Sequence, residues 1–345
     1  MSGGVDSSVS AALLVKAGYE VVGVFIKVWE PACDWRAERR DAMRVAAHLD
    51  TPLITLDLSE EYKKGVVDYM VAEYKGGRTP NPDVMCNKQV KFGAFYDWAM
   101  AHDADYVATG HYAQIKNGSL GKSVDENKDQ TYFLWTLKPE QLTHLLFPIG
   151  GYHKSAVRKL ANKFKLPNAE KKDSQGLCFI GQVDFKDFLK DFIKTKPGEV
   201  VNEQGQVIGH HNGAVFYTIG ERHGFSVQSS TSNTDPLYVI KRDIKNNRLI
   251  VASKLRPEAK ERKIKEVKLE KVNWLINEHS VLIKIKSGKK YQARIRHRGK
   301  LYPCAIKSNK SSTVVEFLLP PEMLASGQSL VLYDKDTCLG GGIIV

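Results

Sequence analysis

Two short segments carry cysteines in surroundings that favour a reactive thiol. The first spans residues 77–88 and reads GRTPNPDVMCNK. Its prolines restrict the backbone on both sides of Asn81, which predicts a rigid, non-helical loop leading to Asp83 and Cys86. We expect Cys86 to open the helix that follows, where main-chain N–H groups and nearby lysines stabilise a thiolate. Asp83 then stands where an acid–base group, or a contact to a substrate base, is needed.

The second segment, residues 171–181, reads KKDSQGLCFIG and places Cys178 after a glycine and a pair of lysines. This context again favours a thiolate. Five cysteines, an odd number spread over 345 residues, do not make a disulfide framework and indicate a reducing compartment, the cytoplasm. A lone cysteine is more often a small buried hydrophobic residue, and we keep that interpretation for Cys33, Cys304 and Cys338.

A phosphate-binding loop is indicated at the start of the chain. After Met1, residues Ser2–Ser8 read SGGVDSS, and adjacent glycines let a tight turn bring several N–H groups to one anion. Apolar spacing over residues 9–16 predicts a helix directly behind them, and a helix N-terminus attracts phosphate. The Walker pattern with its lysine is absent from the sequence. The plainer alternative is a Gly-Gly turn capped by Asp6 and Ser7.

Strand and helix patterns alternate after this loop. Apolar, β-branched runs at 19–28 and 51–58 predict buried strands, helical spacing marks 37–49 and 91–102, and residues 105–111 read DYVATGH. This alternation predicts an α/β domain with a parallel sheet, whose ligands bind at the carboxyl ends of the strands. We expect Ser2–Ser8, Ile26 and residues 109–111 to meet at that edge around one ATP.

The strand that normally feeds a phosphate loop has no counterpart in the sequence, because Met1 alone stands before Ser2. The missing strand would have about five or six residues. We therefore expect the true start to lie roughly ten residues upstream, or the chain to be a truncated product. Without that strand we expect the nucleotide site to lack part of its floor and the domain to be less stable.

Length and charge indicate a multidomain protein with a polyanionic partner. A chain of 345 residues is long for a single core, and its formal net charge is +12. Helical periodicity gives way near Pro197 to short strands separated by glycines. We predict a catalytic domain at 1–196, a small β-rich domain at 197–257 and a C-terminal domain at 258–345. No apolar run approaches the ~20 residues that span a bilayer, so we expect no membrane partner.

The C-terminal domain carries a basic pattern. Alternation predicts a hairpin with a turn at Ser287-Gly288, whose solvent face carries Lys284 and Lys286 on one strand and Arg294, Arg296 and Arg298 on the next. Such a stripe suits the phosphates of a nucleic acid. Ordinary solvated lysines and arginines on an exposed strand are the alternative.

The whole set of motifs resembles one family. SGGVDSS, TPNPDVMCN, ATGHY, NKDQTYFL, KKDSQGLCFIG and the ending CLGGGIIV are similar, in this order, to the tRNA-specific 2-thiouridylases of the PP-loop ATP pyrophosphatase superfamily. The resemblance implies an N-terminal PP-loop domain, a small β-rich central domain and a C-terminal β-barrel that binds tRNA. It also implies ATP-dependent adenylation of the C2 oxygen of the wobble uridine and delivery of sulfur as a cysteine persulfide, with 2-thiouridine, AMP and pyrophosphate as products. Pyrophosphate chemistry implies Mg²⁺, for which no ligand is assigned.

The resemblance also assigns roles to single positions. Cys86 matches the nucleophile and Cys178 the persulfide carrier. The ATP-binding positions are Ser2, Gly3, Gly4, Val5, Asp6, Ser7, Ile26 and Gly110; the target-base positions are Asn81, Pro82 and Asp83; the tRNA contacts are His111, Lys128, Asp129, Gln130, Arg296, His297 and Gln328. Ile26 stands where Met is frequent, and His297 where Tyr is often found.

Several alternatives remain open at this point. A persulfide on Cys178 attacks the activated C2 directly, or Cys86 first frees hydrosulfide and forms a disulfide with Cys178. Both routes need a persulfide donor protein and a thiol reductant, and we expect a monomer. An iron–sulfur cluster on Asp83 and the two cysteines ranks second. Rival functions are a PP-loop synthetase for a small metabolite and a tRNA-binding scaffold without catalysis.

Overall fold

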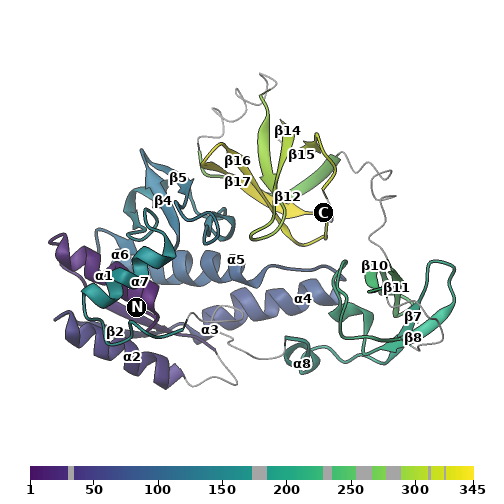
Figure 1. Ribbon diagram of the computed structural model, residues 1–345, viewed down its shortest axis with the longest axis horizontal. Coiled ribbons are helices and arrows are strands. Elements are labelled where there is room, and N and C mark those ends of the chain that lie inside the picture. Colours follow the sequence, from purple (N-terminus) through teal and green to yellow (C-terminus); the bar gives the residue numbers. More distant parts are fainter. Residues whose placement is uncertain are drawn as a thin grey trace.

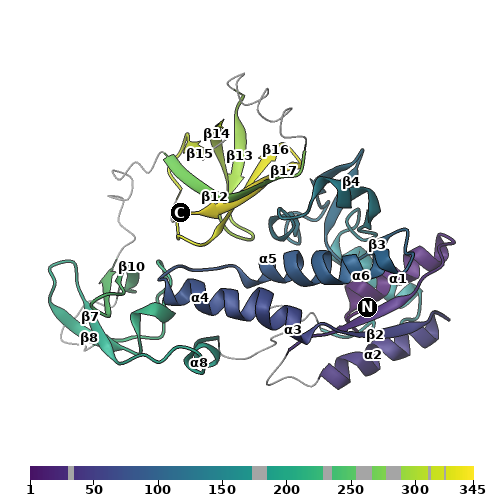
Figure 2. The same cartoon turned by 180° about the vertical axis from the view of Figure 1, so that it is seen from behind.

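The computed structural model describes the chain except for residues 30–34, 173–184, 228–234, 254–265, 277–288, 310–311 and 322–323. Figure 1 shows an α/β part that holds the N-terminus, a β-rich part at the opposite end and a β-barrel above the helices that join them. Figure 2 shows the same layering from behind. The predicted fold class is therefore confirmed, while the domain limits 196/197 and 257/258 stay a prediction.

The α/β part is built on parallel strands with helices packed against them. β1 (Gly23–Lys27) pairs in parallel with β2 (Leu53–Asp57), and β3 (Val107–Ala108) pairs in parallel with β6 (Leu145–Leu146). Among the described residues these strands form two separate pairs, whereas the sequence predicts one sheet. The helices of this part are α1 (Val5–Lys16), α2 (Trp35–His48) and α7 (Lys154–Lys163), and α1 packs on α7.

Two long helical runs lie side by side between the α/β part and the β-rich part (Figure 1). The first consists of α3 (Ser59–Tyr62), the π-helical η1 (Lys63–Asp68) and α4 (Tyr69–Lys75); the second consists of α5 (Pro82–Cys86), the π-helical η2 (Asn87–Ala94) and α6 (Phe95–Ala101). They touch closely at Gly65, where an added Cβ would lie 2.8 Å from Cβ of Gln89. Residues 76–81 connect the two runs beneath the barrel.

The β-rich part is a five-stranded sheet in the order β10-β11-β7-β8-β9, in which β11 and β7 are parallel. Val200, Val239 and Leu249 of this sheet are buried in the same hydrophobic cluster as the long helices. Its elements are α8 (Phe185–Lys190), β7 (Gly198–Val201), β8 (Val207–His211), η5 (Ala214–Phe216), β9 (Ser226–Val227), β10 (Tyr238–Asp243) and β11 (Arg248–Ala252).

The C-terminal part is a closed six-stranded antiparallel barrel with its own hydrophobic core. Its strands are β12 (Glu266–Trp274), β13 (Tyr291–Arg294), β14 (Leu301–Asn309), β15 (Ser312–Phe317), β16 (Ser329–Asp334) and β17 (Thr337–Ile344). The order is β12-β15-β14-β13-β16-β17, and the β12–β17 pairing closes the ring. A hairpin of the α/β part, β4 (Ala113–Lys116) and β5 (Ser119–Lys122), adds to the barrel through a Thr337–Gly121 pairing.

An irregular segment of the α/β part fills the space beneath the barrel. It contains the short helices η3 (Thr131–Phe133) and η4 (Pro139–His144). Trp135 is buried there, its indole N–H donates to Oγ of Ser329 at 3.0 Å, and a Cβ on Gly341 would lie 3.2 Å from its ring. Glycine at that position of β17 therefore admits the indole. Within the described residues, no helix is both long and apolar enough to cross a bilayer.

Candidate active site

The phosphate loop is shorter and tighter than the sequence predicts, because α1 begins at Val5. The N-cap of α1 is Gly4, and no side chain caps this helix end. Asp6 and Ser7 lie inside the helix, so the alternative of a turn capped by these two residues is wrong. Gly3 has φ +75°, and a Cβ there would lie 2.4 Å from the carbonyl oxygen of Glu38. The loop therefore lies directly on α2 and turns into the N-terminus of α1, the positive end of a helix dipole.

Asp6, in the first turn of α1, is the centre of a polar cluster. Lys154 donates from Nζ to both of its carboxylate oxygens, at 2.8 and 2.9 Å, and the Tyr112 hydroxyl donates to Oδ1 at 2.8 Å. Lys154 is the first residue of α7 and lies 148 positions from Asp6 in the sequence. The sequence around Lys154 carries no local signal of a partner so far away, so this contact is not predicted from the sequence.

Gly110 lies against the same loop. A Cβ on Gly110 would lie 2.7 Å from the nitrogen of Ser7 and 2.8 Å from the carbonyl carbon of Asp6, so the two backbones are in direct contact. The expected meeting of the loop and residues 109–111 is thus observed. Asn168 is hydrogen-bonded to the loop and to the first turns of α1. Its Nδ2 donates to the carbonyl of Gly3 and to Oγ of Ser8, both at 2.9 Å.

The cysteine segment folds differently from the prediction at one point. The helix begins at Pro82, with Asn81 as N-cap accepting from the nitrogen of Val84 at 3.2 Å. Cys86 is therefore the last residue of α5 and not the first residue of a helix. Its side chain is buried, with 1% exposed. The reason is local: an Asn cap followed by proline at the first helical position is a strong start signal. Asp83 and Cys86 are three positions apart in one helix and so lie on the same side.

The residues assigned to tRNA fall into two groups. Arg296 is exposed, while Lys128 and Gln130 are partly exposed; Gln130 exchanges hydrogen bonds with the main chain of Tyr112, both at 2.9 Å. His111 is buried between Phe92 and Phe147, with Nδ1 2.7 Å from Oγ1 of Thr109. Burial, aided by Lys91, holds the pKa of His111 well below its ordinary value. Asp129 and Gln328 make contacts to the barrel and to residues 79–80, described below.

The predicted basic stripe is wrong at Arg294. Its side chain points into the interface with the α/β part, where Nη1 lies 2.6 Å from Oδ2 of Asp129. Arg296 and Arg298, by contrast, are exposed as predicted. Lys284, Lys286 and the Ser287-Gly288 turn lie outside the described residues. Parity along a strand predicted a solvent face for Arg294, but the closed barrel presses this end of β13 onto another domain.

His297 follows in a partly buried place. Its ring lies 4.4 Å from the ring of Phe133, and its Nδ1 is buried and has no hydrogen-bond partner among the residues that the structure describes. Burial and the charges of Arg298 and Arg294 lower the pKa of His297 to about 4. The neutral ring therefore packs as an aromatic side chain.

Comparison with known proteins identifies the family. Residues 1–182 match the model described as tRNA methyl transferase HUP domain, 186–253 the tRNA methyl transferase PRC-barrel domain and 264–344 the aminomethyltransferase beta-barrel domain. The tRNA-specific 2-thiouridylase MnmA of Nitrosomonas eutropha is 42% identical over all of this chain and 96% of its own length. Those of Enterococcus faecalis and Ligilactobacillus salivarius are 40% and 42% identical, over all of this chain and 93% of theirs.

The chain belongs to the tRNA-specific 2-thiouridylase family. Membership confirms the resemblance inferred from the motifs and identifies an enzyme family with an ATP-utilising PP-loop domain. The roles of single residues stay predictions. Cys178 lies outside the described residues, so its expected approach to Cys86 is untested.

The described part of the chain contains no evident set of metal ligands. No group of three His, Cys, Asp or Glu side chains is arranged there to hold a metal ion. The iron–sulfur alternative requires Cys178 and stays a prediction. Asp6 lies in the first turn of α1, directly after the phosphate loop, and a carboxylate beside phosphates suits a hard cation such as Mg²⁺.

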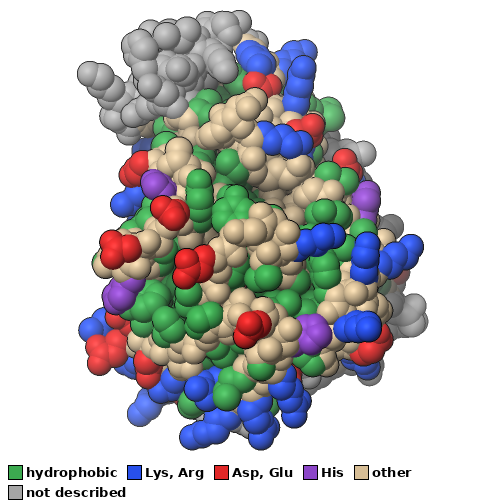
Figure 3. Space-filling model, turned by 90° about the vertical axis from the view of Figure 1, so that its left-hand side faces the viewer, with side chains coloured by type: hydrophobic (Ala, Val, Ile, Leu, Met, Phe, Trp, Pro, Cys, Tyr) green, Lys and Arg blue, Asp and Glu red, His purple; other side chains and the backbone are tan. Residues whose placement is uncertain are grey.

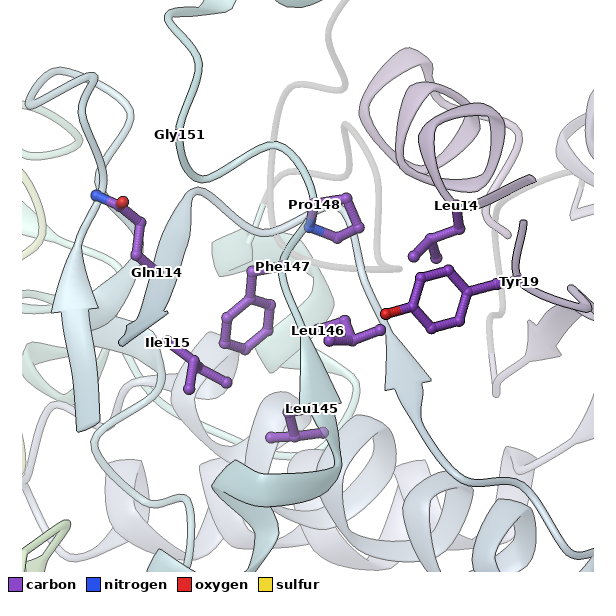
Figure 4. Close-up of a pocket in the computed structure, with 9 residues that line it drawn as sticks. All are labelled: Leu14, Tyr19, Gln114, Ile115, Leu145, Leu146, Phe147, Pro148 and Gly151. Atoms are coloured by element: carbon purple, nitrogen blue, oxygen red, sulfur yellow. The ribbon is translucent and has the colours of Figure 1, made fainter. Parts of the chain in front are cut away.

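A cavity of about 280 Å³ lies elsewhere in the α/β part, near the far end of α1 from the phosphate loop. Figure 4 shows Leu14, Tyr19 and Leu146 grouped at one side of it and Phe147 and Ile115 at the other. Figure 3 shows apolar side chains spread over this end of the molecule, with Lys and Arg gathered along its lower edge. The described residues that line it include no carboxylate, cysteine, histidine or lysine, so they offer no group for the chemistry considered above.

Proposed function

We propose that the protein is a cytoplasmic tRNA 2-thiouridylase that adenylates the C2 oxygen of a wobble uridine and replaces it with sulfur. The observation that carries this proposal is the course of α5: its first residues lie beneath the barrel, and its helical run leads back to the α/β part with the phosphate loop. A base held near Asn81–Asp83 would thus lie between an RNA-gripping module and an ATP site. Family membership supports the same reaction.

In the first step the uracil C2 oxygen attacks the α-phosphorus of ATP. The bond between the α-phosphorus and the bridging oxygen breaks, and pyrophosphate leaves toward the N-terminus of α1, whose dipole favours the anion. Gly110 packs directly on the backbone of Asp6 and Ser7 at this end of α1, where a larger residue would displace the loop. Mg²⁺, if held by Asp6 with the phosphates, supplies positive charge to the leaving group. Lys154 offsets the charge of Asp6 next to the phosphates.

In the second step sulfur replaces the adenylated oxygen. The terminal sulfur of a Cys178 persulfide attacks C2 and AMP departs with the oxygen. The Cys86 thiolate then attacks the inner sulfur of Cys178, which forms a Cys86–Cys178 disulfide and leaves the outer sulfur on the base. In the variant route, Cys86 attacks first and releases hydrosulfide as the nucleophile. A thiol reductant restores both cysteines, and a donor protein reloads Cys178.

tRNA binding is assigned to the barrel and to the segment beneath it. Arg296 and Arg298 are exposed at one end of the barrel, and the chain carries a net charge of +12. A wobble base belongs to a single-stranded loop, so flipping it toward Asn81 costs little stacking energy. We expect a monomer to suffice, because barrel, base loop and phosphate loop belong to one chain.

The test is a nucleoside mass analysis of tRNA after incubation with the protein, ATP, Mg²⁺ and a low-molecular-weight persulfide. We expect 2-thiouridine, with AMP and pyrophosphate formed in step with it. Cys86→Ala should form pyrophosphate and no thiolated product, and Cys178→Ser should behave likewise. Cys304→Ala, in the barrel core, is the control and should keep activity. A methylated nucleoside, or thiolation that survives both site variants, would refute the proposal.

A further inference from the structure

One short turn of the barrel is hydrogen-bonded to the loop that contains the target-base residues. We define the barrel turn as residues 326–329 and the base loop as residues 79–83. The nitrogen of Thr79 donates to the carbonyl of Ser326 at 2.8 Å. Gln328 donates from its side-chain Nε2 to the carbonyl of Thr79 at 3.0 Å and to that of Pro80 at 3.1 Å. Consecutive backbone groups just before Asn81 are therefore bound to the barrel.

The composition of the base loop explains why it needs these partners. Pro80 and Pro82 have no N–H group, so the loop cannot brace itself with the hydrogen bonds of a regular turn. Its carbonyl groups must find donors elsewhere, and Gln328 supplies two from a single amide. An amide NH₂ carries two hydrogens, and these two carbonyls account for both.

The barrel turn is itself held by hydrogen bonds to the last strand of the barrel. The nitrogen of Gly327 donates to the carbonyl of Ile344, and the nitrogen of Ile344 donates to the carbonyl of Gln328, both at 2.9 Å. Gly327 has φ +91°, and a Cβ there would lie 2.9 Å from both the nitrogen and the oxygen of Thr79. The two backbones are in contact, and glycine is required for that approach.

The neighbouring residue of the turn reaches the base loop from a second direction. The carbonyl of Ser329 accepts from the hydroxyl of Tyr132 at 2.8 Å, and Tyr132 is hydrogen-bonded to the side chain of Asn81. Burial raises the pKa of Tyr132, so this hydroxyl keeps its proton. Oδ1 of Asn81 also caps α5, so this side chain links the start of α5 to Tyr132.

We propose that Gln328 is a positioning residue for the target-base loop. The inference rests on the proposed function. Its consequence is that the module gripping the tRNA also sets the position of Asn81, Pro82 and Asp83. The distance between the bound RNA backbone and the base pocket is then fixed, because the barrel and the base loop move together. The base loop therefore does not have to find its reactive position after the RNA binds.

The experiment compares tRNA affinity with the rate at saturating tRNA. Gln328→Met keeps the length of the side chain and removes both donors. We expect its tRNA Kd to stay within about twofold, and its single-turnover thiolation rate at saturating tRNA and ATP to fall by roughly 10- to 100-fold, as for a misplaced reacting group. Gln204→Met, at an exposed position of the β-rich part, is the matched control and should leave both the tRNA Kd and the saturated rate unchanged.

Two further measurements keep the test decisive. Gly327→Ala should reproduce the rate loss, because its Cβ displaces the base loop while the Gln328 amide remains. Hydrogen exchange should show faster exchange in residues 76–82 of Gln328→Met than in the unaltered protein, with equal exchange in the barrel strands. This readout needs no catalysis, so it tests the clamp even if the protein does not thiolate tRNA. A raised tRNA Kd with full rate at saturation, or unchanged exchange in the base loop, would overturn the proposal.

Discussion

Asp129 and Arg294 form a buried ion pair that joins the α/β part to the barrel. Their closest atoms are 2.6 Å apart, and their side chains are 1% and 9% exposed. Asp129 also accepts from the nitrogen of Ser123 at 3.3 Å and from Oγ1 of Thr131 at 3.0 Å. This carboxylate joins the α/β part to the barrel, and its contact with RNA stays a prediction.

Breaking this pair should loosen the barrel. Removing one charge leaves the other buried without a partner, which costs about 3–5 kcal/mol. Asp129→Asn should therefore lower the temperature of thermal unfolding and expose the segment around Thr131 to limited proteolysis. The double variant Asp129→Leu with Arg294→Met should recover much of the loss. A double variant as unstable as Asp129→Asn would mean that the charge pair is not the source of the effect.

Lys154 should matter for ATP more than for stability. Lys154→Met leaves Asp6 without its cation beside the phosphates, and a hydrogen bond to a charged group contributes about 1.5–3 kcal/mol. We expect the KM for ATP to rise roughly 10- to 100-fold, with tRNA affinity unchanged. Lys159→Met, on an exposed site of the same helix, is the control. An unaltered KM in Lys154→Met would separate this lysine from the nucleotide site.

Gly110→Ala should disable the phosphate loop by displacement. The new Cβ would meet the main chain at Ser7 and Asp6, which cannot yield as a flexible side chain does. We expect isothermal titration calorimetry to detect no ATP binding under conditions where the unaltered protein binds. Gly151→Ala, where a Cβ meets nothing within 4 Å, should bind ATP normally. Normal ATP affinity in Gly110→Ala would place the nucleotide elsewhere.

The buried His111 and the partly buried His297 should make the fold sensitive to mild acid. The folded pKa of His297 is about 4, and that of His111 is also lowered, chiefly by burial, against an ordinary value near 6.5. Below that value the unfolded chain takes up protons that the folded chain does not, so stability is full above it and declines as pH falls toward 4. The unfolding temperature should drop between pH 7 and pH 5.

The variant His297→Tyr should remove part of this drop, because the tyrosine ring fits an aromatic site and takes up no proton there. His210→Gln, at an exposed position, should leave the drop unchanged. Equal pH profiles for His297→Tyr and the unaltered protein would contradict the assignment to His297.

Local sequence signals predicted the elements well and their ends less well. The helices at 37–49 and 91–102 and the strands at 19–28 and 51–58 are all present in the structure, with shifted limits. The helix that contains Cys86 begins at Pro82, earlier than the sequence predicts, because Asn81 and Pro82 form a helix start although the two prolines of this segment also favour a loop. The two π-helical segments have no counterpart in the sequence analysis, since they depend on how the two long helical runs pack together.

The sequence by itself determined the chemistry available to this protein: a glycine-rich loop before a helix, cysteines in basic surroundings and a basic C-terminal part, in the order of one enzyme family. Tertiary structure alone decided which residues serve one another. Lys154 reaches Asp6 across 148 positions, Arg294 turns from solvent to Asp129, and Gln328 holds the carbonyls of Thr79 and Pro80. Periodicity reports the face of a single strand or helix, whereas these contacts arise where separate domains bury their polar groups against each other and every such group needs a partner.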